Sequence, residues 1–192
     1  MATSPVDIMN SALIKLGAER IISEDDSSTR ARLCKERYPS VRDALLRSHP
    51  WNFAMAYSQL AEVTPKPGDV FDYERVFQLP SDCLRVISTN LPVDVRWEEI
   101  ENGRIAADTA EIYVKFVRKI SDVTKFDANF VEVLALALAA DIAYSLTQST
   151  AQREEARESL RKELATARSY DAQVGSVRRV ISDDWLDTRR RG

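Results

Sequence analysis

The sequence predicts a mainly α protein: a four-helix bundle interrupted by a small antiparallel β insertion and followed by an extended C-terminal tail. Two observations lead to this fold class. Apolar residues recur at helical spacing near both ends of the chain, whereas the middle third alternates with the period of two that is typical of β-strands. Because the terminal helices have complementary apolar faces and no core without each other, we expect them to pack together.

The pattern divides the chain into four segments. We expect N-terminal helices in residues 1–50, the β insertion in 51–120, C-terminal helices in 121–175 and an extended arm in 176–192. The two helical segments would form one bundle, so the β insertion would interrupt a single core.

The N-terminal segment predicts two helices. Ser4 is a suitable N-cap and Pro5 a suitable first helical residue, and Gly17 is typical of a position just past a helix end. A second helix follows a polar loop and ends at His49, because the residue before a proline disfavours the α region. Pro39 lies inside this second helix, so we expect a kink or a split there.

The middle segment predicts short antiparallel strands. Aromatic residues alternate with small or polar ones from Trp51 to Tyr57, which favours a strand with one buried face. Asn102-Gly103 is the preferred dipeptide of a type I′ hairpin turn. Further short strands are expected near residues 76–79, 84–87, 93–97 and 112–117.

The last third predicts two helices and a tail. Residues 126–146 are apolar on nearly every side, which indicates a central buried helix. Its most apolar part, Phe130–Leu146, contains Glu132 and Asp141 and is too short and too charged to span a bilayer comfortably. From Ala151 an amphipathic pattern continues, with a stripe that includes Val174, and Gly175 is expected to end it.

Composition excludes several function classes. The 192 residues carry 27 Lys+Arg and 30 Asp+Glu, a net charge of −3, which excludes a strongly basic nucleic-acid binder and argues against a cationic membrane-surface protein. Two cysteines do not make a disulfide framework and favour a reducing cytoplasm. The first residues lack the basic and apolar regions of a secretory signal.

Motifs of common enzymes are missing from the sequence. The five glycines build no dinucleotide fingerprint, phosphate-binding loop or nucleophile elbow. The single histidine, His49, excludes His-rich metal sites, and its pairing with Cys34 as a catalytic dyad lacks an orienting partner. We therefore expect no enzyme, no cofactor and no metal, and interpret His49 as the residue that closes a helix.

Four carboxylates remain as candidates for chemistry. Glu98, Glu99 and Glu101 could bind Mg²⁺ or act as an acid/base pair, although solvated charge beside a hairpin turn is the favoured interpretation. Asp141 lies in the apolar helix, where a catalytic carboxyl would have a raised pKa. More often such a group pairs with an arginine on a neighbouring helix or faces a subunit interface, and we favour these two alternatives.

The C-terminal tail carries an isolated tryptophan among arginines. Trp185 lies between the pair Arg178 and Arg179 and a run that begins at Arg189. Tryptophan and arginine dominate interaction hot spots, so an anchor for a protein partner is favoured over contact with nucleic acid.

Several segments together resemble a known family. The matching stretches are Tyr38–Ala54, Leu60-Ala61, Phe77–Val86 and Phe130–Leu134, the last of which opens an Ala/Leu-rich helix. In this order they resemble the head-to-tail adaptors of tailed bacteriophages, also called tail tubular protein A or head-completion proteins. The resemblance extends from about Val6 to Ala172 and lies in packing residues.

The resemblance implies a role in the virion. Such adaptors are structural proteins that form rings of about twelve copies beneath the portal protein, made in the host cytoplasm and located at the head–tail junction. The ring contacts the tail or nozzle protein and continues the channel, so genomic DNA would pass without specific binding and no membrane is involved. Their C-terminal segment commonly reaches the portal.

These implications assign provisional contacts to this chain. Portal binding would fall to Trp185, Arg178, Arg179 and Arg189, and the hairpin tip at Asn102 and Gly103 would meet a neighbouring subunit or the tail protein. Two alternatives remain: a cytoplasmic helical protein-interaction module and, less favoured, a small carboxylate-dependent hydrolase. A mass measurement separates a ring from a monomer or dimer.

Overall fold

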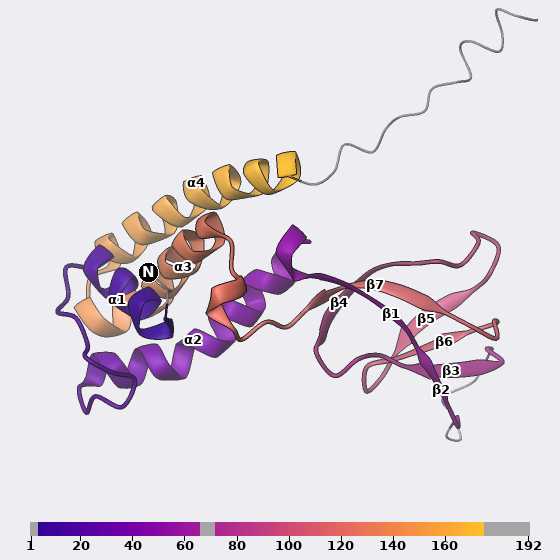
Figure 1. Ribbon diagram of the computed structural model, residues 1–192. Coiled ribbons are helices and arrows are strands. Elements are labelled where there is room, and N and C mark those ends of the chain that lie inside the picture. Colours follow the sequence, from indigo (N-terminus) through magenta and orange to yellow (C-terminus); the bar gives the residue numbers. More distant parts are fainter. Residues whose placement is uncertain (1–3, 66–71, 175–192) are drawn as a thin grey trace, which may run out of the picture.

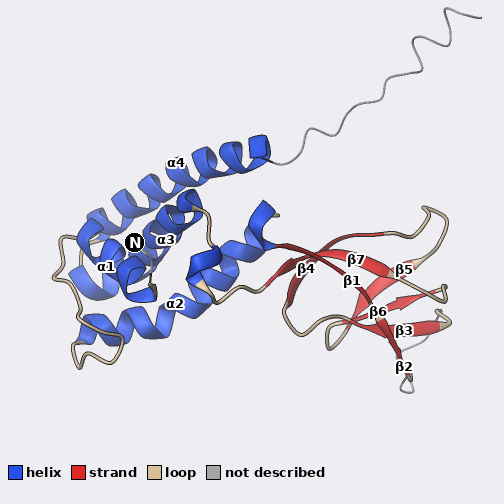
Figure 2. Cartoon of the chain, viewed as in Figure 1, coloured by secondary structure: helices blue, strands red, loops and turns tan. Residues whose placement is uncertain are grey.

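The structure, a computed structural model, describes residues 4–65 and 72–174. Within these residues, four α-helices gather at one end of the molecule and seven β-strands at the other (Figures 1 and 2). The helices are α1 (Pro5–Lys15), α2 (Thr29–Ser48), α3 (Ala128–Thr147) and α4 (Thr150–Val174). The strands are β1 (Met55–Gln59), β2 (Ala61–Val63), β3 (Arg75–Gln78), β4 (Cys83–Thr89), β5 (Trp97–Ile100), β6 (Arg104–Ala107) and β7 (Tyr113–Arg118).

The expected four-helix bundle with a small β insertion is wrong. About 50% of the described residues are helical and about 20% lie in strands, which form two antiparallel sheets of three and four strands. The sheets enclose a core of their own, separate from that of the helices. The main helix–helix contacts all involve α3, so α1, α2 and α4 surround one central helix. A helix that is apolar on nearly every side can accept neighbours all round, which removes the need for a closed bundle.

Local signals determine the ends of α1 as predicted. The Ser4 hydroxyl accepts a hydrogen bond from the Asp7 backbone N–H, and the Asp7 carboxylate accepts one from the Ser4 backbone N–H, so the two form a capping box. Hydrogen bonding to Ser4 lowers the pKa of Asp7. At the other end Gly17 has a φ of +69°, the left-handed conformation that glycine adopts without strain.

The second helix is continuous, so of the two expected effects of Pro39, a kink or a split, the split is wrong. Pro39 lies within α2 on its exposed side, while Tyr38, Leu45 and Leu46 are buried against the helical core. Burial of this apolar face outweighs the one backbone hydrogen bond that proline removes. The predicted end of the helix is confirmed, since α2 stops at Ser48 and His49 has extended backbone.

The start of the predicted first strand is also wrong. Trp51 precedes a short 3₁₀ turn over Asn52–Ala54, and β1 begins only at Met55. The rings of Trp51 and Phe53 both pack against Phe130 of α3, with centroid distances of 5.2 and 5.0 Å. The turn places both rings in the helical core, and the chain enters the sheet only after it, at Met55.

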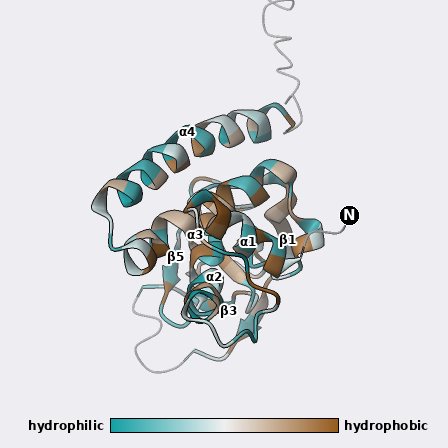
Figure 3. Ribbon diagram, turned by 90° about the vertical axis from the view of Figure 1, so that its left-hand side faces the viewer, coloured by the Kyte–Doolittle hydropathy of each residue, from teal (hydrophilic) through white to brown (hydrophobic). Residues whose placement is uncertain are grey.

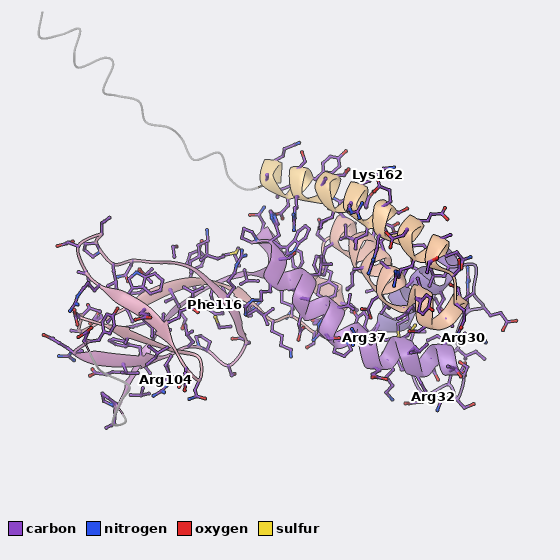
Figure 4. All side chains as sticks on the ribbon, turned by 180° about the vertical axis from the view of Figure 1, so that it is seen from behind. Arg30, Arg32, Arg37, Arg104, Phe116 and Lys162 are labelled. Carbon is purple, nitrogen blue, oxygen red and sulfur yellow. The ribbon has the colours of Figure 1, made fainter. Side chains whose placement is uncertain are left out.

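The strands form two sheets. One has the order β1-β7-β4 and the other β2-β3-β6-β5, and all neighbouring strands are antiparallel. Strand β7 serves both cores, because Val114 and Phe116 pack in the core between the sheets and Val117 packs against the helices. Figure 4 shows Phe116 near the junction of the two parts. The predicted strand near residues 93–97 starts only at Trp97, and Val93 is fully exposed in a loop.

The last two helices differ in polarity. Ten of the twenty residues of α3 are buried. Contrary to the expectation that this segment is too short and too charged, α3 is long and apolar enough by composition to cross a membrane, because it extends over Ala128–Thr147; half of its most apolar stretch is buried inside the protein. Helix α4 is mostly polar and lies along α3, with its hydrophilic side outward (Figure 3). Ala156 and Ala167 of its predicted stripe are buried, but Val174 is exposed, so the stripe ends before it.

Candidate functional site

The cysteine–histidine pair does not form. Cys34 and His49 are separated by 15 residues of α2 and its cap, a rise of roughly 22 Å. Cys34 is fully buried in the helical core, and burial raises the pKa of its thiol to about 11. The His49 side chain instead lies 3.1 Å from the Asp171 carboxylate of α4. His49 therefore joins two elements, beyond its expected role of closing a helix.

The carboxylates beside the hairpin are held apart. Glu98 and Glu99 are consecutive residues of β5, so their side chains point to opposite faces of the sheet. The Tyr73 hydroxyl donates to Glu98 at 3.4 Å, and Glu101 lies exposed in the turn. Among residues 4–65 and 72–174, no group of three His, Cys, Asp or Glu side chains is placed to hold a metal ion.

The predicted partner of Asp141 is present. Arg37 of α2 donates two hydrogen bonds to the Asp141 carboxylate, from Nε at 2.6 Å and from Nη2 at 3.1 Å. This confirms the expected pairing with an arginine on a neighbouring helix. The Asp141 side chain is 30% exposed, however, so the pair lies at the surface of the α2–α3 contact, where it fixes how the two helices face each other.

The hairpin tip is exposed, but its connection is longer than expected. Ile100 pairs with Arg104, so three residues, Glu101–Gly103, join β5 to β6, whereas a type I′ turn has a two-residue connection. Asn102 and Gly103 have φ values of +62° and +64°, the positive values that a type I′ turn needs at both central positions. The Gly103 carbonyl accepts hydrogen bonds from the Leu79 backbone N–H and from the Gln78 amide, both at 2.9 Å. The tip is thereby held firmly while its outer side stays open to solvent.

The proposed portal contacts lie outside the described residues. Arg178, Arg179, Trp185 and Arg189 all follow Val174, the last described residue. Their roles stay predictions.

A groove that the sequence did not indicate lies over α3 between α1 and α4. Its volume is about 570 Å³. Its lining includes Leu16 after α1, Leu136 and Ala139 of α3, and Ala156 of α4, which are buried or nearly so. At one side Lys15 forms an ion pair with Glu132. Sequence reasoning missed the groove because its three walls come from three distant segments.

The charges on α4 are segregated around this groove. On the outer side, Glu154 and Glu158 form ion pairs with basic residues of the same helix, among them Arg157, Arg161 and Lys162. Figure 4 shows Lys162 on this outer side. Glu155 and Glu163 line the groove and have no ion-pair partner among the described residues. The groove therefore combines an apolar floor with an acidic rim, which suits a partner with basic and apolar side chains.

A second surface lies on the outer face of the three-stranded sheet. Tyr57 of β1 and Lys115 of β7 are directly opposite, with the Lys115 ammonium 5.6 Å from the centre of the Tyr57 ring. Tyr113 is two residues from Lys115 and therefore on the same face. Tyr57 is 73% exposed and Tyr113 is 43% exposed, so this face presents two tyrosines to solvent. Exposed tyrosines are enriched at protein interfaces.

Comparison with known proteins adds no family. No protein-family model matches the sequence, and no curated protein is significantly similar to it. The candidate site is therefore defined by the chain itself: a groove on the helical part and a tyrosine face and hairpin tip on the β part.

Proposed function

We propose that this chain is a head-to-tail adaptor of a tailed-bacteriophage particle, a structural protein that forms a ring between the portal and the tail. The observation that carries the proposal is the separation of two interaction surfaces on one elongated body. The α1–α3–α4 groove is on the helical part, whereas the tyrosine face and the hairpin tip are on the β part (Figure 1). A ring subunit needs such separate surfaces, because it binds neighbours and partners at once.

The segments that carry the family resemblance support the proposal by their position. Residues 38–54 contain the end of α2 and the joint at Trp51, and residues 77–86 contain the end of β3 and the start of β4. Both stretches hold the helical part and the β part together. The resemblance, which extends from about Val6 to Ala172, thus includes the segments that join the two parts.

The groove suits the contact between neighbouring subunits. In a ring each subunit contacts the next through two different patches, so a concave patch on one side needs a complementary patch on the other. The unpaired Glu155 and Glu163 would select a basic patch of the neighbouring copy. The hairpin tip and the tyrosine face would then contact a neighbour or the tail protein.

The test is assembly on the portal. We expect the purified protein, mixed with portal rings of the same phage, to form complexes in which electron microscopy shows an additional ring of about twelve copies. The variant Glu155→Gln/Glu163→Gln should weaken ring formation, because it removes both unpaired carboxylates. Glu154→Gln/Glu158→Gln is the matched control, with the same change on the outer side of α4.

If the protein stays a monomer or dimer and binds no portal ring, the interaction-module alternative gains support. If both glutamine pairs reduce ring formation equally, the groove is not a subunit contact, although the adaptor function could still hold.

A further inference from the structure

The end of α4 is fastened to the point where the chain passes from helices to sheets. The Asp171 carboxylate accepts a hydrogen bond from the Asn52 backbone N–H at 3.0 Å through Oδ1, and its Oδ2 lies 3.1 Å from His49 Nε2. The Asp171 backbone carbonyl accepts a bond from the Asn52 side-chain amide. One residue of α4 thus holds both the cap of α2 and the first residue of the turn before β1.

This contact is largely shielded from water. The Asp171 side chain is 13% exposed and the His49 side chain 21% exposed. Both carboxylate oxygens have a partner, and water competes little for these hydrogen bonds while the contact is closed. The contact is therefore stronger than the exposed ion pairs farther along α4.

Few other interactions hold this end of α4. The fully buried residues of the helix are Ala156 and Ala167, and the last two turns expose Tyr170 and Val174 by 53% and 78%. Arg168 adds one long hydrogen bond of 3.4 Å to the Ser48 hydroxyl. Asp171 is thus the principal attachment of the final turns to the rest of the protein.

The residues on the other side of the contact are firmly anchored. Trp51 is 1% exposed, its indole N–H donates to the Leu45 carbonyl at 3.1 Å, and its ring meets the His49 ring edge-on at 4.7 Å. Asn52 begins the turn that leads into β1, and β1 pairs with β7 along its whole length. A change at Asn52 is therefore passed directly to the base of the sheet.

We propose that Asp171 is a latch that couples the C-terminal end of α4 to the base of the β part. While the latch is closed, the last turns of α4 and the segment His49–Asn52 hold each other in place. Displacement of the end of α4 opens the latch, which loosens residues 52–57. Coupling of this kind is reciprocal, so a partner that shifts the β part also loosens the end of α4.

The latch is a property of the fold and does not depend on which partner displaces the end of α4. In an adaptor it would link events on the two sides of the ring, since the C-terminal end and the β part would meet different partners. The latch transmits a displacement between the end of α4 and the base of the β part. Its opening leaves the helical core around α3 unchanged.

Hydrogen–deuterium exchange of the full chain tests this coupling. We expect Asp171→Ala to accelerate exchange at least tenfold in residues 165–171 and also in residues 52–57, with no change in α1 or α3. Asp171→Asn should give a smaller increase in both segments, because it keeps an oxygen for the Asn52 N–H but loses the charge. Glu158→Gln, an exposed carboxylate on the same helix, is the control and should change neither segment.

The only imidazole of the chain provides a second readout. Its NMR signals should move in Asp171→Asn and stay in place in Glu158→Gln. By reciprocity, His49→Gln should accelerate exchange in residues 165–171. If Asp171→Ala accelerates exchange only in α4, or if His49→Gln leaves α4 unaffected, the two parts are not coupled and the proposal is wrong. If Asp171→Ala does not fold, Asp171→Asn and His49→Gln decide in the same way whether the two parts are coupled.

Discussion

At the residue scale, Trp51 joins the helical part to the β part. Its ring is buried to 1% exposure, packs edge-on against Phe130 and donates to the Leu45 carbonyl. We expect Trp51→Ala to lower the free energy of unfolding by about 3–5 kcal/mol, the usual cost of truncating a large aromatic in a core. Urea unfolding monitored by circular dichroism measures this loss of stability. Trp97→Ala, at a residue 37% exposed, should cost much less; equal costs would show that Trp51 has no special structural role.

The two thiols should react slowly. Burial is the main reason why the pKa values of Cys34 and Cys83 are raised to about 11, from an ordinary value of 9.0. A higher pKa lowers the thiolate fraction at any pH below it, by about a hundredfold here, and the thiolate is the reactive form. At pH 7.5 we therefore expect both cysteines to react with iodoacetamide at least about a hundredfold more slowly than free cysteine. In 6 M guanidinium, which removes the burial, the rates should become ordinary. Fast labelling of the native protein would contradict the burial of Cys34 and the partial burial of Cys83.

At the scale of elements, the hairpin between β5 and β6 depends on its turn. Gly103 has a φ of +64°, and its neighbour Asn102 has a positive φ as well. A valine at position 103 would be forced into the left-handed region, at a cost of roughly 1–2 kcal/mol. We expect Gly103→Val to lower the melting temperature slightly and to reduce ring assembly more than solubility, because the exposed tip would change shape.

Asn102→Gly is the control for the hairpin, since glycine accepts the same φ without strain. It should leave stability nearly unchanged. Normal assembly of the Gly103→Val variant would show that the tip is not at an important contact.

The helix α2 should become more stable without its proline. Pro39 is exposed within α2, so its replacement removes no buried contact, and alanine restores the backbone N–H that can donate to the Lys35 carbonyl. We expect Pro39→Ala to raise the free energy of unfolding by about 1–3 kcal/mol. Chemical denaturation measures this, and Ser40→Ala is the neighbouring exposed control. A loss of stability would mean that proline at this position is needed to fit α2 against α3.

At the scale of the whole molecule, residues up to Val174 already form two apolar clusters. Both apolar clusters are formed within residues 4–65 and 72–174. We therefore expect a chain truncated after Val174 to fold and stay soluble, and to lose binding to DNA-free portal rings. Trp185→Ala in the full chain should weaken this binding by about 2–4 kcal/mol, the value of an interaction hot spot. Equal binding of full-length and truncated chains would exclude the C-terminal segment as the portal anchor.

The sequence by itself determined the local features of this protein. The capping box at Ser4, the left-handed Gly17, the end of α2 before Pro50 and the positive φ values at Asn102 and Gly103 all depend on residues within a few positions of one another. Backbone sterics and short-range hydrogen bonds decide such features. The buried α3 could also be predicted, because its composition is mostly apolar on nearly every side.

Only the tertiary structure decided which distant segments meet. Trp51 and Phe53 alternate like strand residues, but Phe130 of α3 offers them a better-packed site, so a turn replaces the strand. The two sheets, the groove that Glu155 lines and the contact of Asp171 with His49 each join segments far apart in the chain. Periodicity shows which face of a segment is apolar but not which segment will cover it, because that choice depends on packing and hydrogen bonding among all candidates at once.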